Sequence, residues 1–174
     1  MAARINETKD HEQLIEVMSQ ESFKKINFRL YLAGIGEKTN YLLKKVKLLK
    51  LEKKIIFLGL LNREELIKFY NRLDLYVQAT KGEAMSMSII EAMNFNIPVL
   101  SSYVAGTKEI LNPKKKIGIF FRDNFSLKKN LLLFNKMSLK NRNLISYCQK
   151  RHLKKFYSSD LMIDKYSELI QKKL

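Results

Sequence analysis

Two acidic residues, Glu83 and Glu91, lie on either side of a predicted helix start, with seven residues between them. Ser86 precedes an apolar run with helical spacing, so we interpret its side chain as the cap of that helix. The free amides of residues 86–89 would then point out of the helix start, where the helix dipole favours a phosphate group. Glu91 lies about one turn further along, where a carboxylate can accept a hydrogen bond from a neutral hydroxyl such as that of a ribose.

The end of this helix is predicted from Asn96 and Pro98. Asn96 can take the left-handed backbone conformation that other side chains resist, and Pro98 then prevents the helix from continuing. The segment from Lys81 to Leu100 therefore predicts a loop, a helix, a second loop and a strand.

This segment resembles the signature of the family 4 retaining glycosyltransferases, Glu-Gly-Phe-Gly-x-x-x-x-Glu-Ala-Met-x-x-Gly-x-Pro-Val. The spacing of the two acids matches in full. Four positions differ, because Ala84, Met85, Ser86 and Asn96 replace Gly, Phe, Gly and Gly. Ser86 and Asn96 can each cap a helix end in place of glycine, whereas a loop that required positive φ at Ala84 would be strained by the side chain.

The resemblance implies a role for each part of the segment and for two basic residues near the start of the chain. Glu83 would bind hydroxyls of a donor sugar, and Glu91 would bind the ribose. The family opens its second domain with Gly-Arg-x4-Lys-Gly, and Arg4 and Lys9 keep that separation. A guanidinium and an ammonium suit phosphate oxygens, so Arg4 and Lys9 would stabilise the departing diphosphate as the glycosidic bond breaks. We therefore expect Glu83, Arg4 and Lys9 to be the catalytic residues.

Three further loops match the family pattern. Gly34-Ile-Gly36 resembles the turn after the second strand of these enzymes, and we expect no direct phosphate contact there. Leu58–Asn62 resembles the loop that contacts the nucleotide base through its backbone, where Gly59 permits close approach. Ser101–Glu109 matches a Gly-Gly-x-x-Glu segment with Ala105 in place of one glycine, and is equally well read as a loop and helix start. The expected donor-binding residues are Ala84, Met85, Ser86, Met87, Glu91, Gly59 and Leu60.

Short apolar segments alternate with amphipathic ones along most of the chain, which predicts a parallel sheet covered by helices on both faces. The predicted strands are 28–33, 54–58, 73–79, 98–101 and 117–121. The predicted helices are 9–20, 37–50, 63–71, 86–95, 105–111, 125–134, 138–152 and 159–172, the last capped by Ser159 or Asp160. The fold class is therefore α/β, Rossmann-like, with a helical C-terminal segment.

We expect one domain over residues 1–174, which the resemblance identifies as the donor-binding second half of a GT-B enzyme. Only Met1-Ala-Ala-Arg-Ile precedes the polar residues that follow, so the first strand looks truncated. We therefore expect the chain to begin inside a longer protein whose N-terminal acceptor domain is absent, and we expect this fragment to be inactive by itself.

Composition restricts the remaining functions. No apolar run approaches the roughly 20 residues of a membrane span, the first residues do not resemble a signal peptide, and a single cysteine, Cys148, excludes a disulfide framework. These features predict a cytoplasmic protein. Thirty-three basic residues against 17 acidic ones give a net charge of +16, which should attract anions. We interpret the lysines mainly as solvated surface, with a peripheral contact with anionic lipid at the membrane's inner face as the alternative.

Other chemistries lack the residues that they need. The two histidines, His11 and His152, have no spacing suited to zinc, so we expect no metal and no cofactor other than the sugar-nucleotide substrate. Nucleic acid is not an expected partner, because no basic face carries interleaved aromatics. The sequence thus predicts the donor-binding domain of a retaining glycosyltransferase for bacterial surface polysaccharide or glycolipid. The alternatives are a non-catalytic α/β module for another phosphorylated ligand and, more distantly, a basic nucleic-acid binder.

Overall fold

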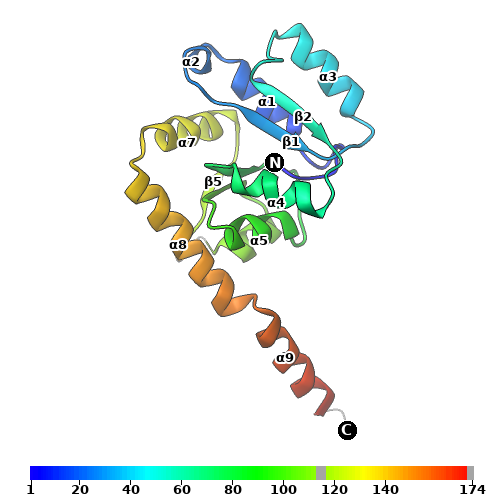
Figure 1. Cartoon of the computed structure of the whole chain (residues 1–174), viewed down its shortest axis with the longest axis vertical. Helices are drawn as coiled ribbons and strands as arrows, with labels where there is room; N and C mark the ends of the chain where they lie inside the picture. Colours follow the sequence, from blue (N-terminus) through cyan, green and yellow to red (C-terminus); the bar gives the residue numbers. More distant parts are fainter. Residues whose placement is uncertain (113–116, 172–174) are drawn as a thin grey trace.

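The computed structural model describes residues 1–112 and 117–171, without the side chains of residues 159, 160, 165 and 169. Helices and strands alternate up to Phe121, and helices follow (Figure 1). The strands are β1 (Leu30–Ala33), β2 (Ile55–Gly59), β3 (Tyr76–Gln78), β4 (Val99–Ser102) and β5 (Ile119–Phe121). The helices are α1 (His11–Ser19), α2 (Glu21–Lys24), α3 (Thr39–Leu48), α4 (Arg63–Asn71), α5 (Met87–Asn94), α6 (Ala105–Leu111), α7 (Asn124–Lys136), α8 (Leu139–Phe156) and α9 (Ser159–Gln171).

The five strands lie where the alternation predicts them, with ends that differ by one to three residues. The largest difference is at β3, where Leu73 still belongs to the turn after α4, because its amide donates to the Tyr70 carbonyl at 3.1 Å. The sequence did not predict the short helix α2. The predicted α/β fold with a parallel sheet is confirmed.

The strands form two parallel sheets, β1-β2 and β3-β4-β5, and the first residues of the chain lie between them. Ala2 makes an isolated parallel bridge to Ala33 in β1. On the other side, the Ala2 amide donates to the Tyr76 hydroxyl in β3 at 3.1 Å. Residues 1–3 therefore connect the two sheets into one twisted layer.

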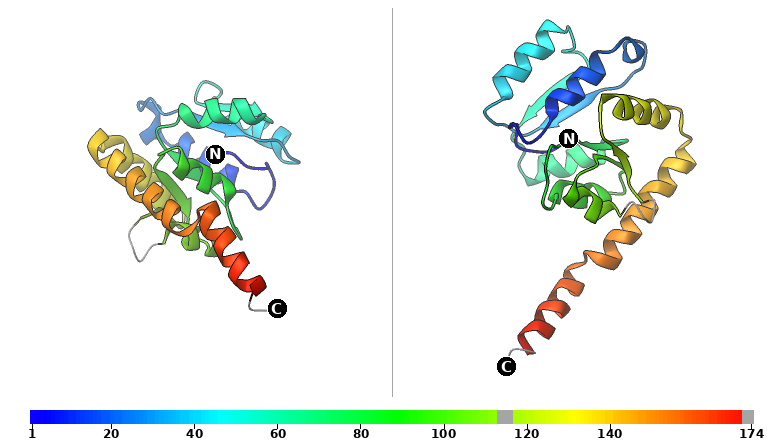
Figure 2. Two further views of the ribbon diagram at one scale, coloured as in Figure 1. Left: turned by 60° about the horizontal axis from the view of Figure 1, so that its bottom comes forward. Right: turned by 180° about the vertical axis from the view of Figure 1, so that it is seen from behind.

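Two hydrophobic cores lie on opposite faces of this layer. Figure 2 shows helices on both sides of the strands. One core packs α1, α3 and α7 against the sheet, around buried residues such as Ile15, Leu42 and Leu127. The other core packs α4, α5, α6 and α8, around residues such as Tyr70 and Met93. Helices cover both faces because the strands alternate apolar side chains up and down, and each face needs a partner layer.

The C-terminal helices begin at polar caps. Asp123 accepts the Ser126 amide at 2.7 Å at the start of α7, and Ser138 accepts the Asn141 amide at 3.3 Å at the start of α8. Helix α9 extends away from the body (Figure 1). The caps predicted for it, Ser159 and Asp160, have side chains outside the described residues. None of the helices in residues 1–112 and 117–171 is long and apolar enough to cross a membrane.

Candidate active site

The carboxyl ends of the parallel strands lie at one edge of the sheet, which is where α/β proteins of this kind bind ligands. The loops after β1, β2, β3 and β4 all leave the sheet at that edge. The predicted site residues of the chain lie on these loops, on α5 and on residues 1–10. The topology therefore gathers segments that are far apart in the sequence.

An ion pair between Lys9 and Glu83 joins two of these segments. The Lys9 Nζ contacts the Glu83 Oε2, and the two side chains are 18% and 12% exposed. The backbones around them are also connected, because the Thr8 carbonyl accepts hydrogen bonds from the Lys81 amide at 2.9 Å and the Thr80 hydroxyl at 3.1 Å. The structure thus brings together the acid and the lysine that the sequence predicted as catalytic partners.

Gly106 fixes the loop that carries Glu83. Its amide donates to the Glu83 carbonyl at 3.0 Å. A Cβ at Gly106 would lie 2.1 Å from the Ala84 carbonyl oxygen and 2.4 Å from that of Glu83, so only glycine allows this approach. Ala84 does not take a positive φ, since the non-glycine residues with positive φ in the described chain lie elsewhere. The alanine therefore causes no backbone strain at this position.

The start of α5 offers unused backbone donors. Ser86 occupies the capping position with extended backbone angles, but its hydroxyl pairs with that of Ser88 at 3.1 Å and caps no amide. The predicted side-chain cap is therefore wrong, although the helix start is right. In the described part of the chain, the amides of residues 83–89 have no acceptor. Met85 and Met87 are exposed, so the helix mouth is open to solvent.

The end of α5 follows the predicted geometry. Asn96 takes φ +58, and the amides of Asn96 and Ile97 donate to the Met93 and Ala92 carbonyls at 3.2 and 3.0 Å. This pattern closes the helix through a left-handed residue, which asparagine tolerates better than other side chains.

Glu91 is held by a tyrosine that the sequence analysis did not select. The Tyr70 hydroxyl donates to the Glu91 Oε2 at 2.7 Å. Tyr70 is buried and stacks on Phe95, with ring centroids 5.2 Å apart. Burial raises the pKa of Tyr70, so the hydroxyl remains a donor at ordinary pH. One carboxylate oxygen of Glu91 is thus occupied, and the other is available to a ligand.

The charges of Glu83 and Glu91 both influence the buried hydroxyl of Tyr76. Burial raises the pKa of Tyr76, and the charges of Glu91 and Glu83 both act on it in the same direction. Tyr76 lies in β3, beneath the start of α5, with its hydroxyl 2.8 Å from the Gln78 Oε1. Both carboxylates are therefore close enough to Tyr76 for their charges to act on it.

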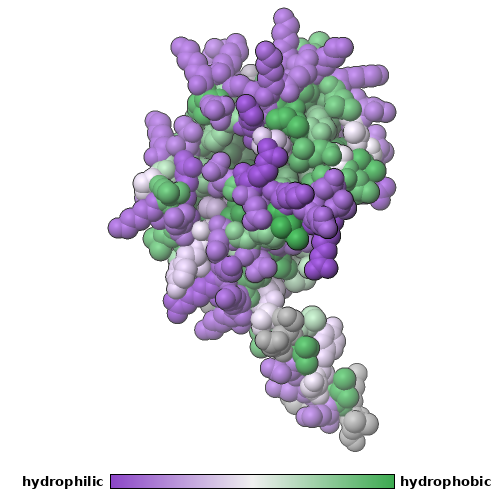
Figure 3. Space-filling model, viewed as in Figure 1, coloured by the Kyte–Doolittle hydropathy of each residue, from purple (hydrophilic) through white to green (hydrophobic). Residues whose placement is uncertain are grey.

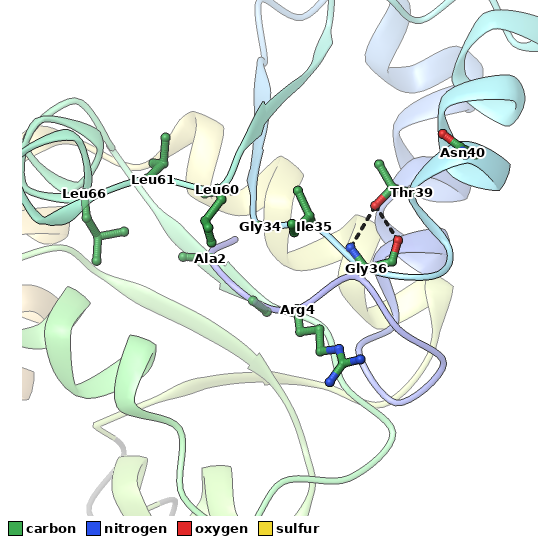
Figure 4. Close-up of a pocket in the computed structure, with 12 residues that line it drawn as sticks. Ala2, Arg4, Gly34, Ile35, Gly36, Thr39, Asn40, Leu60, Leu61 and Leu66 are labelled. Atoms are coloured by element: carbon green, nitrogen blue, oxygen red, sulfur yellow. Dashed lines mark hydrogen bonds between the residues drawn. The ribbon is translucent and has the colours of Figure 1, made fainter.

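A hollow of about 810 Å³ lies at the ends of β1 and β2 (Figure 4). Its walls include Gly34, Gly36, Leu60 and Leu61. Gly34 and Gly36 approach residues 1–6 closely, because a Cβ on either would lie about 2 Å from a backbone carbonyl oxygen there. The hydroxyl of Thr39 accepts the Gly36 amide at 3.0 Å, which closes the turn that the sequence predicted.

Arg4 lies at the rim of this hollow. Its side chain is 75% exposed, and its nearest charged partner is Glu37, with 3.8 Å between Nη2 and Oε2. Figure 4 shows the guanidinium directed away from Leu60 and Leu61. The structure therefore gives Lys9 an acidic partner within the predicted site but leaves Arg4 at the surface.

His11 is buried directly behind Lys9. Its Nδ1 lies 2.9 Å from the Lys9 carbonyl oxygen, so this nitrogen carries the proton in the neutral ring. Burial lowers the pKa of His11 to about 4. No group of three metal-ligating side chains is found within the described residues, and the expected absence of a metal stays a prediction.

Comparison with known proteins decides the family. The model of the family described as "Glycosyl transferases group 1" matches residues 1–151. The chain belongs to this family. An uncharacterised glycosyltransferase of Methanocaldococcus jannaschii is 32% identical over 108 residues, covering 62% of this chain and 27% of that protein. The O-antigen biosynthesis glycosyltransferase WclY of Escherichia coli is 22% identical over 157 residues, which cover 89% of this chain and 42% of that protein.

A solved structure agrees with this assignment at the level of the fold. The chain matches the crystal structure of Anabaena HepE in complex with UDP with a TM-score of 0.84 and 18% identity, covering 98% of this chain and 47% of that one. The glycosyl transferase chain thus spans about a quarter to a half of the length of these relatives. It corresponds in fold to one half of a GT-B enzyme.

The contact at Gly106 leads to a first prediction for this chain. Gly106→Ala should push the Glu83 loop away from α6, since the new methyl group would overlap two backbone carbonyls. We expect a loss of about 1–3 kcal/mol in the free energy of unfolding, measured by urea denaturation. Gly82→Ala is the matched control, because a Cβ there meets no atom within 4 Å. Equal stability of the two variants would contradict the proposed contact.

The buried His11 leads to a second prediction, on pH. The folded state prefers the neutral ring, whereas the unfolded chain binds a proton below about pH 6.5. The contribution of His11 is therefore complete above pH 6.5 and is lost as the pH falls towards 4, by up to ~3 kcal/mol. Chemical denaturation of the wild type and of His11→Asn between pH 7.5 and 5 measures it.

The variant should lose less stability than the wild type over this interval. The α-amino group of Met1, whose pKa burial lowers to about 5, acts in the same direction in both proteins, so their difference isolates His11. Parallel pH profiles would show that His11 is not the titrating group.

Proposed function

We propose that this domain binds a nucleoside diphosphate sugar for a retaining glycosyltransferase. The observation that carries the proposal is the Lys9–Glu83 pair beside the unpaired amides of residues 83–89. Together these groups offer a cation, a carboxylate and a set of N–H donors within one helix mouth. A diphosphate requires the first and the last of these, and a sugar with free hydroxyls suits the carboxylate.

Donor binding would separate the ion pair and give each member a new partner. Lys9 would move to the diphosphate, and Glu83 would accept hydrogen bonds from sugar hydroxyls. The amides near Ala84–Met87 would bind the sugar or the phosphate. Arg4, which is exposed at the rim, would supply a second cation to the leaving diphosphate.

The ribose and the base of the donor would bind elsewhere along the carboxyl edge of the sheet. Glu91, with one oxygen held by Tyr70, would accept a ribose hydroxyl with the other. The base would lie in the hollow beside Gly59 and Leu60, where backbone atoms face the ligand. The similar HepE structure is a complex with UDP, which supports a nucleotide as the ligand of this domain.

The chemistry would depend on electrostatic stabilisation without a metal. As the bond between the anomeric carbon and the diphosphate breaks, its electron pair stays on the diphosphate oxygen, where Lys9 and Arg4 stabilise the charge. The acceptor hydroxyl oxygen forms the new bond to the anomeric carbon on the face that the diphosphate leaves, and its proton passes to the departing diphosphate oxygen. One well-placed donor of this kind is worth roughly 2.7–4 kcal/mol.

The acceptor would be bound by a second domain that precedes this one. The similarity to the O-antigen enzyme WclY supports a glycan or glycolipid acceptor in bacterial surface polysaccharide synthesis. The reaction would take place in the cytoplasm. Without the acceptor domain, this chain should bind the donor weakly and transfer nothing.

Calorimetric titration with UDP, GDP and their sugars tests the proposal. We expect weak binding of at least one of them, and Lys9→Ala and Glu91→Ala should each lower the affinity about tenfold or more, because each removes a charge-assisted hydrogen bond. Lys44→Ala on the exposed face of α3 is the matched control and should bind as the wild type does. Unchanged affinity in both site variants would refute these roles, and no binding of any nucleotide would refute the function.

The contact between Tyr70 and Glu91 allows a sharper test of the ribose site. Tyr70→Phe should lower the affinity for the preferred nucleotide about fivefold, since the carboxylate is no longer held in place. The same variant should bind the 2′,3′-dideoxy nucleotide as the wild type does, because that ligand lacks the hydroxyls. Tyr157→Phe, which removes a hydroxyl that contacts the Glu109 carbonyl, is the control. Equal losses for both ligands would assign Tyr70 a general structural role.

A further inference from the structure

The outer surface of α7 carries large apolar side chains that the core does not use. The inner side of the helix is filled, because Leu127, Leu131 and Phe134 are buried. On the outer side, Phe125 is 75% exposed and Leu133 is 52% exposed. A soluble helix normally confines such residues to one face, so an apolar outer face indicates a contact with something else.

Lysines surround these apolar side chains. A shallow hollow of about 270 Å³ on α7 is lined by Phe125, Lys128, Lys129, Leu132, Leu133 and Lys136, which we call the α7 face. Just beyond the helix, Leu139 is also strongly exposed. Along the left edge of Figure 3, over α7 and the start of α8, hydrophobic and hydrophilic side chains lie next to each other.

Basic residues dominate the charge around the α7 face. Residues 124–159 contain nine basic residues and no acidic one. Two carboxylates lie near the start of α7, because Asp123 caps the helix and Glu16 accepts a hydrogen bond from Asn124. The ion pairs among the described residues include none of the three lysines of the α7 face. The three lysines therefore give this face an excess of positive charge.

We propose that the α7 face docks onto a bilayer that contains anionic phospholipid. Phe125 and Leu133 enter the region between head groups and acyl chains, while the lysine stems lie along the apolar surface and place their ammonium groups at lipid phosphates. Nucleic acid is a poorer fit, because the α7 face offers one aromatic ring where strand binding needs a series of them.

The position of α7 determines which edge of the sheet would face the bilayer. The helix begins three residues after β5 ends, so Phe125 lies towards the edge of the sheet that carries the candidate active site. Docking through the α7 face would hold that edge close to the lipid head groups. The inference uses none of the donor-binding residues and is independent of the nucleotide specificity.

Vesicle flotation of the 174-residue chain tests the proposal. The wild type should bind vesicles of phosphatidylcholine with 30–40% phosphatidylglycerol, roughly the anionic content at which polybasic surfaces adsorb, and should not bind phosphatidylcholine alone. Lys128→Gln/Lys129→Gln/Lys136→Gln should lower binding at least about tenfold, since each lysine near an anionic surface contributes substantially. Phe125→Ser/Leu133→Ser should not bind the anionic vesicles at moderate salt.

A charge-matched variant on another helix distinguishes binding through the α7 face from a general effect of the protein's net charge. Lys44→Gln/Lys47→Gln/Lys53→Gln removes three exposed lysines on and after α3 and should retain most of the binding. Circular dichroism melting verifies that all variants fold. Equal losses from the α3 and α7 variants, no flotation of the wild type, or unchanged flotation of Phe125→Ser/Leu133→Ser would overturn the proposal. Preference for RNA or an acidic protein over anionic vesicles in a competition would overturn it as well.

Discussion

The ion pair between Lys9 and Glu83 is the interaction on which the arrangement of the site depends. It joins residues that are 74 positions apart, and it sits where solvent reaches only a small part of either side chain. Removing one member would leave a charge that is neither solvated nor paired, which costs more than the loss of a surface pair. The pair therefore fixes the loop before α1 against the loop before α5 as long as no ligand replaces one partner.

Close backbone contacts provide the frame for this pair. Gly34, Gly36 and Gly106 each occupy a place where a side chain would overlap a carbonyl group of another loop. The three glycines let residues 1–6, the turn after β1 and the Glu83 loop approach one another at the carboxyl edge. Their role is steric, and only Gly34 among them also has a positive φ.

Much of the fold follows from the sequence, because it depends on local periodicity. The alternation of apolar segments located the five strands, and Asn96 indicated its own left-handed conformation. Glu83 and Lys9 each belong to a short pattern of residues that suits donor binding. Only the family resemblance placed the two residues in the same site. These predictions succeed because a strand, a helix or a helix end is determined by residues within a few positions of one another.

The errors concern side-chain contacts that local periodicity does not determine. The hydroxyl of Ser86 turns to Ser88 instead of capping α5, a choice between two neighbouring partners that the sequence does not encode. Tyr70 reads as an ordinary core residue of α4, and its bond to Glu91 exists only because α4 and α5 pack side by side.

The Lys9–Glu83 pair also gives the candidate site its own internal counter-ion. On the proposed function, a small inorganic anion could satisfy Lys9 but would leave the carboxylate of Glu83 without a partner. A ligand that carries both phosphates and hydroxyls can satisfy the two groups at once. The Lys9–Glu83 ion pair would thus make the site bind sugar nucleotides in preference to the free phosphate and chloride that surround the protein.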